Sequence, residues 1–334
     1  MGFVLGVDAG GTKTIAVIAD ETGQVHGIGK AGSANFQACG VSGARGQIQL
    51  AIQAAARKAD VDLSGFQAVC YGISGADRPV DFDTVRNFTL DLAACPVYRL
   101  ENDTIIALRA GTPDGVGIAL IAGTGSNAIG RNADGAKLQV GGIGRLSGDF
   151  GSAGQLGEAA IVAALMGLDG RGLATGLADK IKSKLGLAQL EDIIEYEFFD
   201  SNRAGLDLGS LAPLIFEAAD EGDQVALALL EEAGINVARG VRVILEKLFS
   251  DQSEVTIVFG GSIFQKGSHP KLIETISRQC RAFHQQTRFV RLEVQPALGA
   301  IGFAFDDLEW PLTKQIFDQM RQSYKSAWPI NPAE

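Results

Sequence analysis

Apolar residues near the start of the chain occur in short β-branched runs that are separated by glycine turns. Runs at about residues 3–8, 14–19 and 25–30 predict a meander of three strands. From Ala44 to Ala59, apolar residues recur at helical spacing and predict a helix. Residues 67–73 read as a buried strand, so strands and helices alternate as they do in α/β proteins.

The rest of the chain continues this alternation. The pattern predicts strands at 97–100, 116–121, 255–259 and 289–294 and helices at 81–92, 225–249, 269–284 and 311–326, with 154–250 mainly helical. No Pro/Ser-rich linker separates the halves. We expect an N-terminal domain over 1–112, joined by the C-terminal helix 312–328, and a second domain over 113–311 with helical insertions.

The first glycine turn has the composition of a phosphate-binding loop. The apolar strand delivers Asp8 into Ala-Gly10-Gly11-Thr12-Lys13-Thr14, and another apolar run follows. Glycines let backbone N–H groups approach phosphate oxygens, and Asp8 is placed to hold Mg²⁺, most simply through water. The order Thr12-Lys13 differs from the P-loop order Gly-Lys-Ser/Thr, so that motif is excluded.

A second segment repeats the pattern of an apolar run, a glycine turn and another apolar run. The apolar run 116–121 leads into Ala122-Gly123-Thr124-Gly125-Ser126-Asn127 and then into another apolar run. Two related hairpins facing each other would bind a nucleotide from both sides, and two unrelated hairpins are the alternative.

Composition restricts the class of partner. The chain has 334 residues, 46% of them hydrophobic and 20% charged, which is typical of a globular protein with sizeable cores. A net charge of −10 argues against nucleic acid or an anionic membrane as partner. The four cysteines lack metal-type spacing and no secretory leader is evident, so we expect reduced thiols and a cytoplasmic location.

Five segments, in this order, resemble the sugar kinase/actin/heat-shock ATPase superfamily. They are Asp8-Ala-Gly-Gly-Thr-Lys-Thr14, Glu101-Asn-Asp103, Ala122-Gly-Thr-Gly-Ser126, Phe259-Gly-Gly-Ser262 and Pro296-Ala-Leu-Gly-Ala300. A further segment, Gly141-Gly-Ile-Gly144 followed by Gly148-Asp-Phe-Gly-Ser152, resembles the BadF/BadG/BcrA/BcrD ATPase family, which includes N-acetylglucosamine kinases. The resemblance implies an α/β fold of two actin-like (ribonuclease H-like) domains flanking an ATP cleft, with ATP and Mg²⁺ as cofactors.

The resemblance also implies a role for each matching residue. Asp103 corresponds to the catalytic base and Asp8 to the metal site. The residues that the resemblance implies for binding of the amino sugar are Asn35, Ser74, Asn102, Asp103 and Asp149. The resemblance implies that three turns bind the nucleotide. Their residues are Gly10, Gly11, Thr12, Lys13 and Thr14; Gly123, Thr124, Gly125 and Ser126; and Gly260, Gly261 and Ser262.

Each of these roles competes with a simpler one. Asp103 follows a strand and precedes an apolar helix, so it is either the base or the helix N-cap, and Asn102 is the other residue suited to cap that helix. Asp149 lies in good turn chemistry, Asn35 suits an ordinary loop, and Lys13 suits a solvated strand. Gly299 and Ala300 suit a close approach to a flat ligand.

The resemblance implies phosphorylation of an amino sugar at its 6-hydroxyl, with N-acetylglucosamine as the leading substrate and a possible homodimer as the assembly. Glucosamine, glucose or an N-acetylmuramate-like sugar is the first alternative, and an ATPase that activates a partner enzyme is the second. The family often has a tryptophan where this chain has Ile143 and a glutamate where it has Phe150. These departures bear on the sugar pocket more than on the phosphate chemistry.

Overall fold

A computed structural model describes residues 2–144, 148–149, 151–198, 206–250 and 254–328. These residues form two compact units, which are described separately below. The first unit lies within residues 1–119, 131–136 and 290–334, and the second within 120–130 and 137–289. The prediction places 113–311 in the second domain, whereas residues 290–311 group with the first unit.

The first unit is built on a mixed five-stranded sheet in the order β3-β2-β1-β4-β5. The predicted meander is confirmed: β1 pairs antiparallel with β2, and β2 with β3. The next two strands instead run parallel to β1, so that β1, β4 and β5 end at the same edge. The strands are β1 (Phe3–Ala9), β2 (Thr14–Asp20), β3 (Val25–Ala31), β4 (Phe66–Ile73) and β5 (Val97–Asn102).

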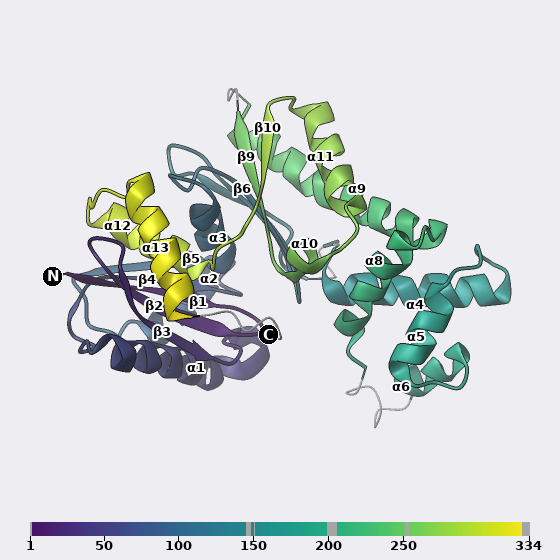
Figure 1. The fold of residues 1–334 in the computed structure, drawn as a ribbon, viewed down its shortest axis with the longest axis horizontal. Helices are drawn as coiled ribbons and strands as arrows, with labels where there is room; N and C mark the ends of the chain where they lie inside the picture. Colours follow the sequence, from purple (N-terminus) through teal and green to yellow (C-terminus); the bar gives the residue numbers. More distant parts are fainter. Residues whose placement is uncertain (1, 145–147, 150, 199–205, 251–253, 329–334) are drawn as a thin grey trace. The chain divides into compact units, whose positions relative to one another are not determined.

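Helices cover both faces of this sheet (Figure 1). The long helix α1 packs on β2 and β3, where Gly27 and Gly29 let the backbone of α1 approach closely. On the other face lies α12, whose approach to β1 requires Gly6. The helices of the unit are α1 (Phe36–Ala59), α2 (Pro79–Thr89), α3 (Asp103–Gly111), α12 (Ala297–Asp307) and α13 (Lys314–Ala327).

Helix α1 begins eight residues before the predicted start at Ala44, because a cap and a kink interrupt the periodicity. Asn35 caps the helix by accepting a hydrogen bond from Gln37 N at 3.0 Å. Gly40 then adopts φ +72°, a left-handed conformation that glycine permits, and the regular helix follows. The first turn is therefore set apart from the apolar stripe that predicted the helix.

The expectation that Gly299 and Ala300 approach a flat ligand is wrong. Gly299 faces the backbone of α3, and a Cβ there would collide with Ile106 O and crowd Ala110 N. Ala300 is fully buried. The small residues of α12 thus serve helix packing, because they let α12 and α3 come together at backbone distance.

The second unit repeats the strand order of the first. Its sheet runs β8-β7-β6-β9-β10, so the hairpin β6–β7 stands where β1–β2 stands in the first sheet. This confirms the repeat that the sequence indicated. The strands are β6 (Gly117–Ala122), β7 (Ser126–Arg131), β8 (Lys137–Val140), β9 (Val255–Gly260) and β10 (Thr287–Arg291).

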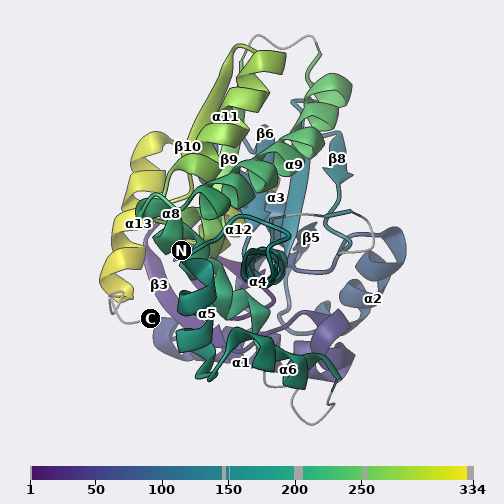
Figure 2. The same ribbon diagram turned by 90° about the vertical axis from the view of Figure 1, so that its right-hand side faces the viewer.

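The long insertion between β8 and β9 is helical, as predicted. Within it α9 contacts β8, α8 and α4, and it lies beside α11 in both views (Figures 1 and 2). The helices of the second unit, of which α10 and α11 follow β9, are α4 (Ala153–Asp169), α5 (Leu177–Leu185), α6 (Ile194–Phe198), α8 (Ala212–Asp220), α9 (Gln224–Leu248), α10 (Ser262–Lys266) and α11 (Lys271–Phe283), with 3-10 turns η2 (Leu190–Ile193) and η3 (Leu208–Leu211). Among the described residues, none of the helices combines the length and the apolar character needed to cross a membrane.

Replacing Gly299 by alanine is expected to destabilise the first unit by about 1–3 kcal/mol, because the new methyl group must push α3 and α12 apart. Gly46→Ala is the matched control, since Gly46 lies in α1 with no atom within 4 Å of its Cβ position. That control should be neutral or stabilise the protein by up to about 1 kcal/mol. Urea unfolding of both variants measures the difference, and equal midpoints would contradict the packing assigned to Gly299.

Candidate functional site

Three parallel strands of the first unit end in one row of residues. Ala9 of β1 pairs with Ile73 of β4, and Ile73 pairs with Asn102 of β5. The next residue of each strand therefore begins a turn or helix at the same edge. These residues are Gly10, Ser74 and Asp103. The register brings a glycine turn, a hydroxyl and a carboxylate together, which the sequence alone had placed far apart.

Asp103 is the first residue of α3 and is half-buried. The Ser74 side chain hydrogen-bonds to this carboxylate, and Thr104 contributes backbone and side-chain hydrogen bonds. Burial, and then the nearby charge of Asp77, raise the pKa of Asp103 to about 6. A carboxylate in this range is ionised at neutral pH yet more basic than an ordinary aspartate, as a general base requires.

Asn102, and not Asp103, caps α3. Its Oδ1 accepts from Thr104 N at 2.8 Å, so this alternative from the sequence analysis is confirmed. The carboxylate of Asp103 is thereby left available for chemistry. The side chain of Asn102 is only 4% exposed.

Asp8 lies at the end of β1, where its charge and that of Asp103 act on one another. Burial, and then the charge of Asp103, raise the pKa of Asp8 to about 7, and the charge of Lys13 opposes this shift. Two carboxylates that repel one another favour a bound cation, and Mg²⁺ is often held by one or two carboxylates with water and substrate phosphate. Among the described residues there is no cluster of three His, Cys, Asp or Glu that would form an all-protein metal site.

The turn after Asp8 is exposed over Gly11, Thr12 and Lys13. Gly10 N donates to Lys13 O at 2.9 Å and closes it, while the Cβ position of Gly11 has no atom within 4 Å. This open backbone suits the approach of a phosphate. Thr14 differs from its neighbours, because it is fully buried and its hydroxyl donates to Gly32 O at 2.8 Å.

The start of α1 borders the same edge of the sheet. Asn35 Oδ1 lies against Gly75, which adopts φ +86°, and Gln37 Nε2 donates to Gly75 O at 3.3 Å. Asn35 is thus brought to the turn that carries Ser74. Gln37 was missed by sequence reasoning, because a lone glutamine on a helix start carries no motif.

The remaining predicted residues lie in the second unit, where two of the three segments meet. Gly123 N donates to Gly125 O at 2.8 Å, and Thr124 and Gly125 are exposed. The Ser262 hydroxyl lies 3.3 Å from the Cβ position of Gly123. Gly261, with φ +88°, packs so tightly on Ala122 that a side chain would collide with its carbonyl oxygen. Ser126 begins β7, and Gly260 ends β9 in a buried position.

Asp149 organises a glycine-rich loop of the second unit. Its Oδ2 accepts from Gly144 N at 2.6 Å, its Oδ1 faces Gly141, and its carbonyl accepts from Gln155 Nε2. This is the turn role that competed with sugar binding, and the predicted sugar contact stays a prediction. Ile143 is 72% exposed beside this loop, and Phe150 lies outside the described residues.

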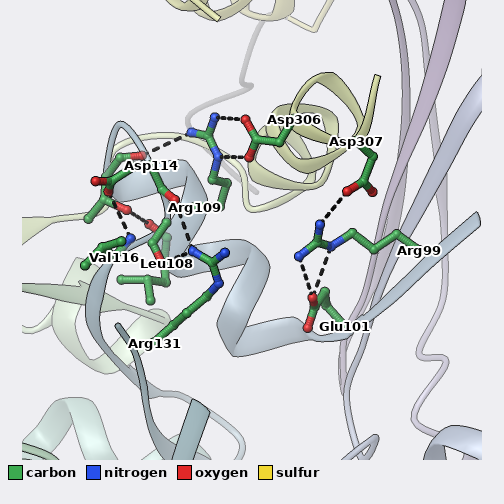
Figure 3. Close-up of polar contacts among 11 residues, drawn as sticks. Arg99, Glu101, Leu108, Arg109, Asp114, Val116, Arg131, Asp306 and Asp307 are labelled. Atoms are coloured by element: carbon green, nitrogen blue, oxygen red, sulfur yellow. Dashed lines mark hydrogen bonds and ion pairs between the residues drawn. The ribbon is translucent and has the colours of Figure 1, made fainter. Parts of the chain in front are cut away.

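Ion pairs hold β5 and α3 against α12 (Figure 3). Arg109 is 2% exposed, and its Nε and Nη2 bond to the two carboxylate oxygens of Asp306 at 2.9 and 3.0 Å. Arg99 pairs with Glu101 at 2.9 Å and with Asp307 at 2.7 Å (Figure 3). The bidentate pair fixes geometry, so the helix that begins with Asp103 is anchored to α12 at its C-terminal end.

A family model and individual relatives match this chain over most of its length. The BadF/BadG/BcrA/BcrD ATPase family model matches residues 5–304. An N-acetyl-D-glucosamine kinase of Dictyostelium discoideum is 29% identical over 89% of this chain and 95% of its own. An N-acetylmuramic acid/N-acetylglucosamine kinase of Clostridium acetobutylicum is 29% identical over 90% and 97%. A solved structure from Chromobacterium violaceum, assigned as an N-acetylglucosamine kinase, has a TM-score of 0.71 at 23% identity and covers 91% of this chain and 99% of that one.

The two shifted carboxylates predict an unusual pH dependence of stability. Between about pH 4 and pH 7 the folded protein holds protons on Asp8 and Asp103 that the unfolded chain has lost. The free energy of unfolding should therefore fall as the pH rises through this window. Asp8→Asn should raise the free energy of unfolding at pH 8 by about 1–2 kcal/mol and leave it nearly unchanged at pH 4.

Urea unfolding at both pH values, without Mg²⁺ or nucleotide, measures this effect. Asp134→Asn is the control, because Asp134 is an exposed carboxylate. Equal stability of wild type and Asp8→Asn at pH 8 would contradict the crowding of charge at this edge.

Proposed function

The chain belongs to the BadF/BadG/BcrA/BcrD ATPase family, and from this premise we propose that it is an ATP-dependent sugar kinase. The acceptor is the 6-hydroxyl of an amino sugar, and N-acetylglucosamine is the leading substrate, giving N-acetylglucosamine 6-phosphate. Two relatives that are each 29% identical carry N-acetylglucosamine kinase in their names, which supports this choice.

One observation carries the proposal. A carboxylate with a raised pKa, Asp103, lies at the same sheet edge as a second carboxylate, Asp8, and an exposed glycine turn. Phosphoryl transfer to an alcohol needs these three functions, because it depends on a base, on charge neutralisation and on positioning of phosphate.

Asp103 acts as the general base. It takes the proton of the sugar hydroxyl while the hydroxyl oxygen forms a bond to the γ-phosphorus and the bond to the β–γ bridging oxygen breaks, releasing ADP. The Ser74 hydroxyl donates to the carboxylate and fixes its orientation. A positioned base of this kind contributes roughly 10²–10⁴ in rate.

The phosphates are bound by the backbone N–H groups and polar side chains of Gly10, Gly11, Thr12 and Lys13, with Asp8 holding Mg²⁺ through water. Mg²⁺, when bound, neutralises the charge of the β- and γ-phosphates. Thr14, at the end of this turn, is fixed by the hydrogen bond that its hydroxyl donates to Gly32 O. The turns at 123–126 and 260–262 supply the second phosphate loop and the border of the adenosine, the roles that the family resemblance implies.

The sugar is contacted by Asn35, Ser74, Asp103 and Asp149 in this proposal. Glucosamine, glucose and an N-acetylmuramate-like sugar are the competing acceptors, and the relative from Clostridium acetobutylicum is named for two acceptors. Carboxylates and amides read hydroxyl patterns through hydrogen bonds, and a site built in this way rejects analogues that leave its groups unpaired.

A panel of sugars tests the proposed reaction. ADP release is measured with ATP and Mg²⁺ against N-acetylglucosamine, glucosamine, glucose, N-acetylmannosamine, N-acetylmuramate and no sugar, with phosphorus NMR of the product. We expect the highest kcat/KM for N-acetylglucosamine and a 6-phosphate product. ADP release that does not depend on sugar would favour an ATPase that activates a partner enzyme, and no release with any sugar would contradict the proposed kinase activity.

Asp103→Asn is expected to lower kcat by about 10²–10⁴ while the nucleotide Kd stays within about threefold, because the amide keeps the shape but cannot accept the proton. Asp134→Asn serves again as the control for a lost exposed carboxylate. Near-wild-type turnover of Asp103→Asn would remove this residue from the role of base.

A further inference from the structure

The side chain of Asn102 makes three hydrogen bonds within the first unit. Its Oδ1 accepts from Thr104 N at 2.8 Å, and its Nδ2 donates to Asp77 Oδ1 at 2.9 Å and to Ala76 O at 3.3 Å. An amide nitrogen has two hydrogens, so both are used, and the side chain is buried. One end of the amide thus binds the start of α3, and the other binds the turn after β4.

These bonds begin where the backbone pairing of the two strands stops. Ile73 and Asn102 are the last paired residues of β4 and β5. Beyond this row no ladder joins the turn at 74–77 to α3, yet Ser74 and Asp103 must keep their relative positions for the hydroxyl to orient the carboxylate. The Asn102 side chain joins the turn at 74–77 to the start of α3 just beyond the last backbone pair of the two strands.

The turn at 74–77 is the common neighbour of the other parts of the site. Ser74 N donates to Ala9 O at 2.9 Å, next to Asp8. Gly75 O accepts from Gln37 Nε2 at the start of α1. A shift of this turn relative to α3 would therefore move Asp103 away from every other group at this edge.

We propose that Asn102 is a positioning residue for phosphoryl transfer, which holds Asp103 in place through its hydrogen bonds to Asp77 and Ala76 and does not contact the sugar. The inference rests on the proposed kinase function for its kinetic consequence only. It replaces the sugar contact that the family resemblance implied for Asn102. We call the hydrogen bonds from Asn102 Nδ2 to Asp77 and Ala76 the tether, and Asp77, which the sequence analysis did not single out, is one of its two acceptors. Small displacements of reacting groups are costly, since an error of about 1 Å can reduce a rate by 10².

Two pairs of variants separate the tether from its alternatives. Asn102→Ser keeps a hydroxyl that can cap α3 but is too short to reach Asp77, whereas Asn102→Ala loses both functions. Asp77→Asn keeps an oxygen acceptor of the same shape, whereas Asp77→Ala removes it. Both Asp77 variants lose the negative charge, so the difference between them reports the loss of the oxygen acceptor and not the loss of charge. Measuring above pH 7.5 keeps Asp103 ionised in every variant.

With the sugar that the wild type phosphorylates, Asn102→Ser and Asp77→Ala should each lower kcat about ten- to hundredfold, with the sugar KM changed by less than about threefold. Asp77→Asn should rescue most of the kcat lost in Asp77→Ala. The double variant Asn102→Ser/Asp77→Ala should be no slower than Asn102→Ser alone, because Asn102→Ser already removes the hydrogen bond to Asp77. A tenfold rise in the sugar KM for Asn102→Ser, with additive losses in the double variant, would instead indicate a direct sugar contact and overturn the proposal.

A readout independent of turnover keeps the inference separate from the proposed function. Amide hydrogen exchange of residues 74–78 and 103–106 should speed up at least fivefold in Asn102→Ser compared with the wild type. Thr313→Ala is the matched control, because Thr313 caps α13 of the same unit by accepting from Ile316 N, so its loss destabilises a helix without touching the tether. Unchanged exchange in Asn102→Ser would overturn the tether even if the kinase activity is confirmed, and absence of sugar phosphorylation by the wild type would refute the proposed function alone.

Discussion

The parallel pairing of β1, β4 and β5 is the constraint on which the candidate site of the first unit depends. It aligns Ala9, Ile73 and Asn102 in one row, so that the residues that follow them start their turns side by side. A shift of one residue in either pairing would turn each side chain to the opposite face of the sheet and separate Asp8, Ser74 and Asp103. The register is held by the buried core of the unit and by the helices on both faces of the sheet.

The site carries a free-energy cost that the rest of the unit must offset. Burial and neighbouring carboxylate charge raise the pKa values of Asp8 and Asp103, so the unliganded site lowers the free energy of unfolding as the pH rises to neutrality. The bidentate pair of Arg109 with Asp306 and the close packing at Gly299 lie behind this edge and keep α3 in place. Strain of this kind is typical of sites that are complementary to a charged ligand.

The sequence predicted the helices and strands better than it predicted the contacts between them. Apolar runs located β1, β2 and β4 because these strands are buried along most of their length, whereas β8, which has no buried residue, was missed. The glycine turn at 10–13 was visible because glycines and hydroxyls follow a single carboxylate. Asn35 was predicted as a sugar contact or an ordinary loop residue, and its role as the cap of α1 was missed, since the cap precedes a kink that hides the first turn of the helix. Gly299 was predicted to contact a ligand because a small residue in the sequence is equally compatible with close approach of a ligand or of another helix. Asp77 and Gln37 became visible only with the register, because nothing local distinguishes them.

The central claim is that the strand row brings Asp8 and Asp103 into one electrostatically coupled pair. A carbon-13 NMR titration of selectively labelled aspartates, in the absence of Mg²⁺ and nucleotide, tests it most directly. The account predicts a pKa of about 7 for Asp8 in the wild type and a lower value in Asp103→Asn, where the neighbouring charge is gone. An Asp8 pKa that stays the same in the variant would show that the two carboxylates do not meet and would contradict the account.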